Sequence, residues 1–169
     1  MKNVEISLKD FTLRTLELSD DLQDYLYWMS HPENNEYIHS AKKSYSLTEL
    51  QDFIESCNLN PNIILLGIFD PKNHVHIGNI KYENINLTNK SAEMGILIGE
   101  KKYRGKGIAK NVIEGSAKWL KVNLSLQTIF LGVDQNHSAA IRMYSKIGFI
   151  SENKQLQNRL KMRWDINVK

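Results

Sequence analysis

The amino-acid sequence predicts an α/β (α+β) fold, in which a mixed, mostly antiparallel sheet of six to seven strands is flanked by about four helices. Three observations support this prediction. Apolar segments of strand length dominate the middle of the chain, and a long amphipathic helix follows them. Beyond that helix the pattern continues as strand, helix and strand. A strand, a helix and a second strand imply a right-handed crossover within a mixed sheet.

Bulk composition indicates one globular domain spanning residues 1–169. Hydrophobic residues make up 41% of the chain and charged residues 24%, the balance of an ordinary folded protein. The single cysteine, Cys57, excludes an internal disulfide and a multi-cysteine metal site, which fits a reducing compartment. No apolar run is long enough to span a bilayer, and the N-terminus does not resemble a signal peptide. We therefore expect a cytoplasmic protein with no membrane partner.

The N-terminal part predicts two strand pieces and a helix. Residues 4–8 and 11–16 are strand-like, and the polar pair Lys9–Asp10 interrupts them. The segment Ser19–Asp21 then offers an N-cap and an acidic first turn. Apolar side chains follow at helical spacing until Pro32, where we expect this helix to end.

A second helix and a group of strands come next. The helix is predicted to begin at Ser46 or Thr48, because either residue can cap its N-terminus. Apolar residues then repeat at the helical period: Leu50, Phe53, Ile54 and Cys57. The extended patterns of residues 62–70 and 75–85 are joined by turn residues, which predicts an antiparallel hairpin. Residues 92–99 add another strand.

The C-terminal half begins with the amphipathic helix, predicted over residues 105–122. Two apolar stripes lie side by side on it: Ile108, Val112, Ser116 and Trp119, and next to them Ala109, Ile113, Ala117 and Leu120. Lysines and Glu114 occupy the opposite face. Residues 126–133 are predicted to be a strand, residues 138–146 a short helix, and the segment from Phe149 onward two final strands.

The most informative segment runs from Arg104 to Ala109 and connects a predicted strand to the amphipathic helix. Its glycines allow a sharp turn, and the amides at a helix N-terminus point outward without intrahelical partners. Such a turn binds phosphate, and Arg104 and Lys106 add charge that suits a diphosphate. A basic turn of this kind can also be a simple connection. The segment lacks the G-x-x-x-x-G-K-[ST] pattern of a P-loop, and Lys110 breaks the G-x-G-x-x-G dinucleotide fingerprint.

Two blocks of the sequence resemble the GNAT superfamily of N-acetyltransferases. Arg104-x-x-Gly107-x-Ala109 matches the R/Q-x-x-G-x-G/A signature of that family, and residues 133–149 resemble its N-x-x-(A/S)-x-x-x-Y-x-K-x-G-F region. The resemblance is weaker near the N-terminus, where Asp24–Met29 look like the branch of ribosomal-protein N-terminal and nucleotide-amino-sugar acetyltransferases. It implies a GNAT-like fold with acetyl-CoA in a cleft between the fourth and fifth strands.

The resemblance also implies which groups hold the coenzyme. The family's loop cradles the pyrophosphate of acetyl-CoA, and its counterparts here are Arg104, Gly105, Lys106, Gly107, Ile108 and Ala109. In the family, main-chain groups near the end of the preceding strand pair with the pantetheine arm; here these belong to Leu97, Ile98 and Gly99. Asn136 is implied as a further coenzyme contact, and its residue type also suits the N-cap of the following helix.

Aminolysis of a thioester needs a neutral amine, a stabilised oxyanion and a proton for the departing thiolate. The resemblance places Tyr144 beside the coenzyme sulfur as the acid; the alternative is an aromatic side chain that only packs on its helix face. Glu93 is the candidate base, directly or through water, particularly if burial raises its pKa. The alternative is an outward-facing or ion-paired glutamate. Asp134 and Glu83 are weaker candidates, and a base is unnecessary if the amine binds neutral.

Two further groups of residues receive structural interpretations. His74 and His76 lie next to a turn and lack a third ligand, so we expect solvent-facing side chains and no metal site. Trp28 is expected to pack in the core; alternatively, it lines an acceptor pocket together with Tyr25 and Tyr27.

The sequence therefore predicts an acetyl-CoA-dependent N-acetyltransferase that acts by direct attack in a ternary complex. Its partners are acetyl-CoA or CoA and an amine acceptor: a protein N-terminus, a nucleotide-linked amino sugar or another small amine. The alternative is a non-catalytic acyl-CoA-binding module of the same fold. A net charge of +3, with glutamates interrupting the basic stretch, argues against nucleic acid as a partner. A homodimer is possible through pairing of the strand over residues 156–168.

Overall fold

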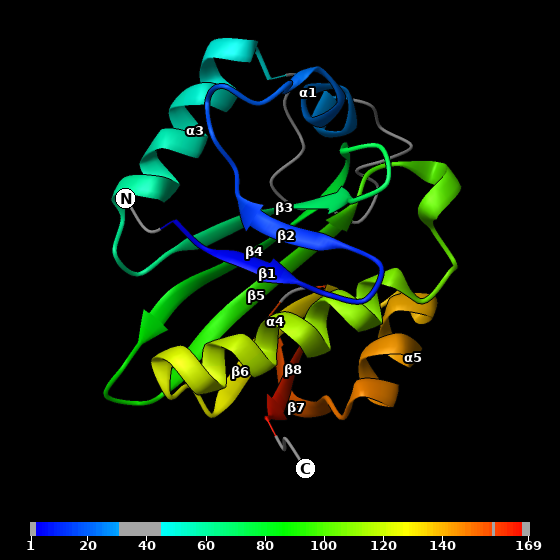
Figure 1. Ribbon diagram of the computed structural model, residues 1–169. Helices are drawn as coiled ribbons and strands as arrows, with labels where there is room; N and C mark the ends of the chain where they lie inside the picture. The colour runs from blue at the N-terminus through cyan, green and yellow to red at the C-terminus, as the bar shows by residue number, and fades with distance from the viewer. Residues whose placement is uncertain (1–2, 31–44, 157, 167–169) are drawn as a thin grey trace.

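The computed structural model describes residues 3–30, 45–156 and 158–166. These residues form an eight-stranded sheet in the order β1-β2-β3-β4-β5-β6-β8-β7 (Figure 1). The strands are β1 (Glu5–Ser7), β2 (Thr12–Thr15), β3 (Ile64–Asp70), β4 (Val75–Asn86), β5 (Ser91–Ile98), β6 (Thr128–Asp134), β7 (Ile150–Leu156) and β8 (Arg159–Asp165). Neighbouring strands are antiparallel except for β5 and β6, which are parallel. The predicted mixed, mostly antiparallel sheet is confirmed.

The sheet has eight strands rather than six or seven because the first two strand pieces are separate strands. β1 and β2 form an antiparallel hairpin in which Glu5 lies opposite Arg14. The amide of Leu8 donates to the carbonyl of Phe11 over 2.8 Å and closes the turn. The polar pair Lys9–Asp10 therefore reverses the chain instead of interrupting a single strand.

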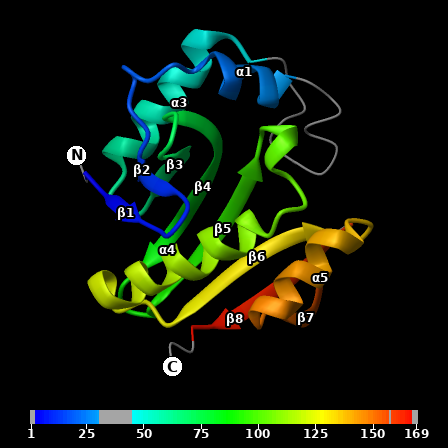
Figure 2. The ribbon, with the colours of Figure 1, turned by 45° about the vertical axis from the view of Figure 1, so that its right-hand side comes forward.

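Helices cover both faces of the sheet (Figures 1 and 2). In the described part of the chain they are α1 (Gln23–Ser30), α3 (Leu47–Leu59), α4 (Ile108–Leu124) and α5 (Ser138–Ile147), with a 3-10 turn η1 (Lys101–Tyr103) before α4. One core lies under α1 and α3, and the other under α4 and α5. Because side chains of a strand alternate between faces, Met94 of β5 packs in the α4 core and Leu97 in the α1 core.

The predicted helix starts form through local hydrogen bonds. The Ser46 hydroxyl accepts from the Glu49 amide over 3.2 Å, and the Glu49 carboxylate accepts from the Ser46 amide over 2.8 Å. This capping box gives α3 its N-terminus, and loss of such a cap costs about 1 kcal/mol. At α1, the Asp21 carboxylate accepts from the amide of Gln23 over 3.0 Å. Pro32, the predicted end of that helix, lies outside the described residues.

The parallel pair of β5 and β6 is the point where the sheet opens. Residues 91–93 of β5 pair with residues 128–130 of β6. Beyond them, β5 stays paired with β4 as far as Ile98, and β6 stays paired with β8 as far as Asp134. Figure 2 shows the two strands diverging toward the C-terminal end of β5. Once the N-terminal hairpin is counted as two strands, β5 and β6 are the strands predicted as the fourth and fifth.

The strand at the C-terminal end is confirmed, but its place in the sheet corrects the expected dimer contact. β8 lies between β6 and β7, with Met162 opposite Leu131 on one side and Ser151 on the other. A strand with two neighbours has no free edge for a strand of a second subunit. The predicted pairing of residues 156–168 across a dimer is therefore wrong for residues 159–165, which form β8; Leu156 belongs to the edge strand β7, and residues 157, 167 and 168 lie outside the described residues. The edge strands of the sheet are β1 and β7.

Candidate active site

A tight turn with two glycines connects η1 to α4. Gly105 and Gly107 have φ angles of +73° and +76°, in the left-handed region that side chains disfavour. Nothing lies within 4 Å of the position that a Cβ would take at either glycine, so the turn presents bare backbone to its surroundings. Ile108 is buried and anchors the turn to the core, whereas Lys106 is exposed and Ala109 is half-buried. The predicted turn before the helix is confirmed.

The backbone amides of residues 105–110 have no hydrogen-bond acceptor among the described residues. The first bond of the helix ladder runs from the Asn111 amide to the Gly107 carbonyl over 3.2 Å, so the amides of residues 108–110 precede it. Within the part of the chain that the structure describes, no side chain caps α4 and no hydrogen bond engages the amides of residues 105–107. These donors lie at the N-terminus of α4, the positive end of the helix dipole, an arrangement that suits a phosphate group.

Arg104 ties the turn to the end of β5. Its Nε donates to the Ile98 carbonyl over 2.8 Å, and its Nη2 donates to the Gly99 carbonyl over 2.7 Å. The Gly99 amide donates to the carbonyl of Ile77 in β4 over 3.0 Å. Two of the residues predicted to pair with a pantetheine arm thus already hold Arg104, although each carbonyl keeps a second lone pair. The third, Leu97, is half-buried against the α1 core.

Tyr144 lies on the inner face of α5. Only 9% of its surface is exposed, and its ring meets Phe149 edge-on at a centroid distance of 5.6 Å. Burial raises the pKa of Tyr144 to about 12, so the phenol keeps its proton at neutral pH. No hydrogen bond within the described residues engages its hydroxyl. Packing accounts for the position of the ring and leaves the hydroxyl as the group that can act on a ligand.

Glu93 is the last residue of β5 that pairs with β6, where it lies opposite Phe130. Its side chain is exposed, as in the alternative interpretation of an outward-facing glutamate. The burial that could have raised the pKa of a catalytic base is absent. On its other side Glu93 lies opposite Glu83 of β4, whose carboxylate is 2.8 Å from Lys81 Nζ. The Lys81 Nζ lies over the ring of Phe53 in α3. Two carboxylates therefore flank the divergence of β5 and β6, on the sheet face that carries α3.

Asn136 does not cap α5, contrary to the prediction. The helix begins at Ser138 with His137 in the N-cap position. The Asn136 amide donates to the Asp134 carboxylate over 2.8 Å, and the Asn136 carbonyl accepts from the Ser138 amide over 2.9 Å. The carboxylate of Asp134 thus shapes this turn. The side chain of Asn136 is exposed, and its coenzyme contact stays a prediction.

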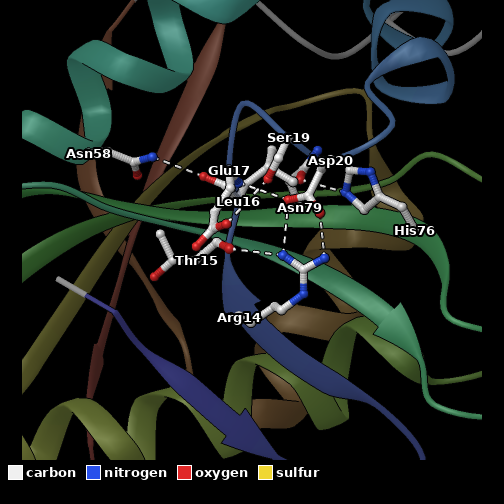
Figure 3. A network of polar contacts seen from close by, with 9 residues as sticks. All are labelled: Arg14, Thr15, Leu16, Glu17, Ser19, Asp20, Asn58, His76 and Asn79. Carbon is white, nitrogen blue, oxygen red and sulfur yellow. Dashed lines mark hydrogen bonds and ion pairs between the residues drawn. The ribbon is translucent and has the colours of Figure 1, made fainter. Parts of the chain in front are cut away.

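A polar network that the sequence did not predict lies between the β2–α1 connection and β4 (Figure 3). Arg14 and Asp20 form a bidentate ion pair, with a distance of 2.9 Å from Nη1 to Oδ2. Burial pushes the pKa of Asp20 upward, but hydrogen bonds from Arg14 and from the Glu17 amide outweigh it and lower that pKa. Nearby, His76 Nε2 and Asn79 Oδ1 are 2.9 Å apart in a buried pair. Burial lowers the pKa of His76.

A β-bulge explains why His76 is buried and not solvent-facing as predicted. The register between β3 and β4 shifts between Ile68 and Phe69. A bulge re-aims side chains, and here it turns His76 to the same face as Asn79, three positions away. The imidazole stacks on Phe69 at 4.9 Å and lies 5.1 Å from the Trp28 ring. Trp28 packs in the core, as expected.

A surface pocket of about 460 Å³ lies elsewhere. It is lined by α4, the end of α5 and β8, with Lys118, Ile147 and Trp164 among its residues, and by none of the residues predicted for coenzyme binding or catalysis. Backbone geometry therefore defines the candidate site: the open edges of β5 and β6 and the turn before α4. His74 is exposed, and no three potential metal ligands gather among the described residues.

The sheet opens at its parallel pair next to an amide-rich turn, as the resemblance to coenzyme A-dependent acyltransferases implies. Sequence comparison makes the assignment specific, because residues 10–150 match the acetyltransferase (GNAT) domain family. That match covers most of the chain. The protein belongs to the GNAT acetyltransferase family, an enzyme family that uses acetyl-CoA as the acetyl donor, and the fold and resemblance inferred from the sequence are confirmed.

Curated relatives and solved structures agree with this assignment. The chain is 28% identical over 144 residues to an N-alpha-acetyltransferase of Saccharolobus solfataricus, covering 83% of this chain and 81% of that protein. It is also 28% identical over 144 residues to a spermidine N(1)-acetyltransferase of Vibrio cholerae serotype O1. This match covers 83% of this chain and 79% of that protein. A solved structure of a spermidine N-acetyltransferase from Vibrio cholerae, in complex with CoA and spermine, shares the fold with a TM-score of 0.81 at 24% identity. The match covers 94% of this chain and 96% of that chain.

No described helix combines the length and apolar character needed to cross a membrane.

Proposed function

We propose that the protein transfers the acetyl group of acetyl-CoA to a primary amine, by direct attack in a ternary complex, as one cytoplasmic domain over residues 1–169. The observation that carries the proposal is the divergence of β5 and β6 directly beside the amide-rich turn. The open edge of β5 runs from Glu93 toward Ile98, and Arg104 joins its end to the turn. A diphosphate at the turn and a pantetheine arm along this edge bring the thioester toward Glu93.

In this proposal the residues of the turn, 104–109, hold the pyrophosphate, Leu97–Gly99 pair with the pantetheine arm, and Asn136 adds a contact. Tyr144 donates a hydrogen bond and then its proton to the sulfur as the carbon–sulfur bond breaks. Its raised pKa supports a phenol that is protonated when the thiolate leaves. Glu93 accepts the proton of the attacking amine, directly or through water, and its exposure supports contact with an acceptor that enters from solvent.

The acceptor is proposed to be a protein N-terminus, a polyamine or another small amine, with a nucleotide-linked amino sugar as a further candidate. The two curated relatives are named for the first two of these substrates. The carboxylates of Glu83 and Glu93 support a cationic acceptor, since an ammonium group is stabilised by opposite charge nearby. If a homodimer forms by strand pairing, it uses an edge strand of the sheet and not β8.

Titration calorimetry with acetyl-CoA and with CoA tests the coenzyme site. We expect micromolar binding by the wild type and its loss in Gly107→Glu, because the new carboxylate repels the diphosphate and a side chain is strained at this φ angle. Val122→Glu adds the same charge at the far end of α4, where residue 122 is 72% exposed, and should bind normally. Wild-type protein that binds neither ligand contradicts the proposal.

Turnover is tested separately with a thiol-release assay. Peptides with free N-termini, spermidine and amino sugars are offered as acceptors, and release of CoA with at least one of them is expected. Coenzyme binding without release from any amine favours the non-catalytic acyl-CoA-binding module instead.

A further inference from the structure

The indole of Trp28 lies directly on the backbone of Gly99. A Cβ added to Gly99 would overlap the Cδ2, Cε2 and Cε3 atoms of the indole, all of which belong to its six-membered ring. Trp28 is 1% exposed, so its ring cannot withdraw into solvent. Gly99 does not have a left-handed φ angle. A glycine is therefore required here for close approach, not for backbone conformation.

The indole also belongs to an aromatic cluster. The ring centroids of His76 and Tyr25 lie 5.1 Å and 6.2 Å from that of Trp28. His76 is in turn stacked on Phe69 and hydrogen-bonded to Asn79. Buried aromatic rings in mutual contact move little, because protein interiors are close-packed. The position of the indole is thus set relative to β3 and β4.

Gly99 is also one of the two residues at the end of β5 whose carbonyls bind Arg104, the other being Ile98. The carbonyl of Gly99 accepts from Arg104 Nη2 over 2.7 Å, and its amide donates to the Ile77 carbonyl over 3.0 Å. With the indole against its Cα, Gly99 is fixed on three sides. The Arg104 guanidinium is rigid and also binds the Ile98 carbonyl, so a shift of Gly99 shifts Arg104 and the turn that follows it.

We infer that Trp28 is a positioning residue for the coenzyme: by fixing Gly99, it sets where Arg104 and the amides of residues 105–107 stand. The inference rests on the proposed function, because it concerns the same coenzyme site. It assigns to α1 a structural link to the turn that holds the diphosphate in the proposed function. Trp28 acts through Gly99 and Arg104, with no contact to the coenzyme required.

The test measures the dissociation constant of CoA by calorimetry, alongside the melting temperature of each variant. Gly99→Ala, which displaces the indole, is expected to weaken CoA binding about tenfold. Gly115→Ala is the matched control: a methyl group there also meets a neighbouring side chain, that of Leu8, but it does not touch the Trp28–Gly99 contact. This control should leave the dissociation constant of CoA unchanged, whichever way the gain in helix propensity and the contact with Leu8 shift the melting temperature.

A compensating variant separates positioning from general destabilisation. In Gly99→Ala with Trp28→Phe, the smaller ring makes room for the methyl group, and CoA affinity should return to within about threefold of wild type. If Gly99→Ala does not fold, Trp28→Phe alone keeps the inference testable, with CoA binding expected to weaken about threefold. Folded Gly99→Ala with wild-type affinity, or no recovery in the double variant, overturns the inference.

The proposed function and the role of Trp28 are contradicted by different results. Wild-type protein that does not bind CoA overturns the proposed function and this inference together. Wild-type binding with an unaffected Gly99→Ala variant overturns the inference alone.

Discussion

The hydroxyl of Tyr82 on β4 donates a hydrogen bond to Ser116 Oγ on α4 over 2.8 Å, and both side chains are fully buried. The direction of this bond follows from the second bond of Ser116, whose single proton goes to the Val112 carbonyl over 2.6 Å. The helix whose N-terminal turn is the proposed diphosphate site is therefore held on the sheet by a polar bond as well as by its apolar face.

This geometry predicts unequal losses of stability. Ser116→Ala leaves the buried Tyr82 hydroxyl without a partner and should lower the free energy of unfolding by about 1–3 kcal/mol. Tyr82→Phe leaves Ser116 bonded to Val112 and should cost only about 1 kcal/mol. Urea unfolding of the two variants at equal pH gives the comparison. A larger loss in Tyr82→Phe would show that the hydroxyl of Tyr82 is not the donor.

Tyr144→Phe is expected to lower kcat about 100-fold, because a positioned acid contributes roughly that much. The KM for acetyl-CoA should stay within about twofold, since the ring still packs in the same place. With a pKa of about 12, Tyr144 should impose no fall in kcat as the pH rises from 6 to 10. If kcat of the wild type falls near pH 9 and this fall disappears in Tyr144→Phe, Tyr144 loses its proton in that range, which contradicts its role as an acid that stays protonated.

Glu93→Gln tests the proposed base. The substitution keeps the size of an exposed side chain, so the free energy of unfolding should change by no more than about 0.5 kcal/mol. We expect kcat to fall by about tenfold or more at neutral pH, and Glu83→Gln to have a smaller effect. Steady-state rates at saturating acetyl-CoA decide the point. Unchanged kcat in Glu93→Gln means that the amine binds already neutral.

Acid is expected to destabilise the protein through His76. Burial lowers the pKa of His76 below 6.5; the nearby carboxylate of Asp20 favours the charged imidazole and Arg14 opposes it. The other neighbours are neutral: Asn79, Tyr25, Trp28 and Phe69. As the pH falls below about 6.5, the unfolded chain takes up a proton that the folded state excludes, so stability falls by at most about 1.4 kcal/mol per pH unit.

His76→Leu serves as the control for this pH dependence. It should remove the slope between pH 6.5 and 5 in unfolding experiments. The loss of stability that accompanies protonation of Asp20 should persist in the His76→Leu variant. It occurs at more acidic pH, below about 4, because the pKa of Asp20 is lowered in the folded state. Wild-type stability that is constant from pH 7 to 5 contradicts the role of His76.

Much of the fold could be predicted because the signals are local. The stripes of α4 follow from helical periodicity, and its innermost positions, Val112, Ile113 and Ala117, have no exposed surface. The glycine turn could also be predicted, since left-handed φ angles at Gly105 and Gly107 demand a residue without a side chain. These features depend on neighbouring residues alone.

Features that depend on pairing between distant segments could not be predicted. The burial of His76 results from a register shift against β3, which leaves no mark in the residues around it. The N-cap of α5 is His137 and not Asn136, although asparagine is the preferred residue type at that position, because the Asp134 side chain accepts from the Asn136 amide. The contact of Trp28 with Gly99 joins residues far apart in the chain, and a lone glycine at a strand end does not indicate what lies on it.

The strand order β6-β8-β7 has a consequence for how the protein is made. During synthesis β7 leaves the ribosome before β8, yet it has no partner in the sheet until β8 is available to lie between it and β6. The edge of β6 therefore stays uncovered through that interval, a state in which an open strand invites pairing with another chain. Once both are released, β7 and β8 join the sheet together as an antiparallel unit. Slowing translation across residues 150–165 should accordingly lengthen the period in which nascent chains need protection from aggregation.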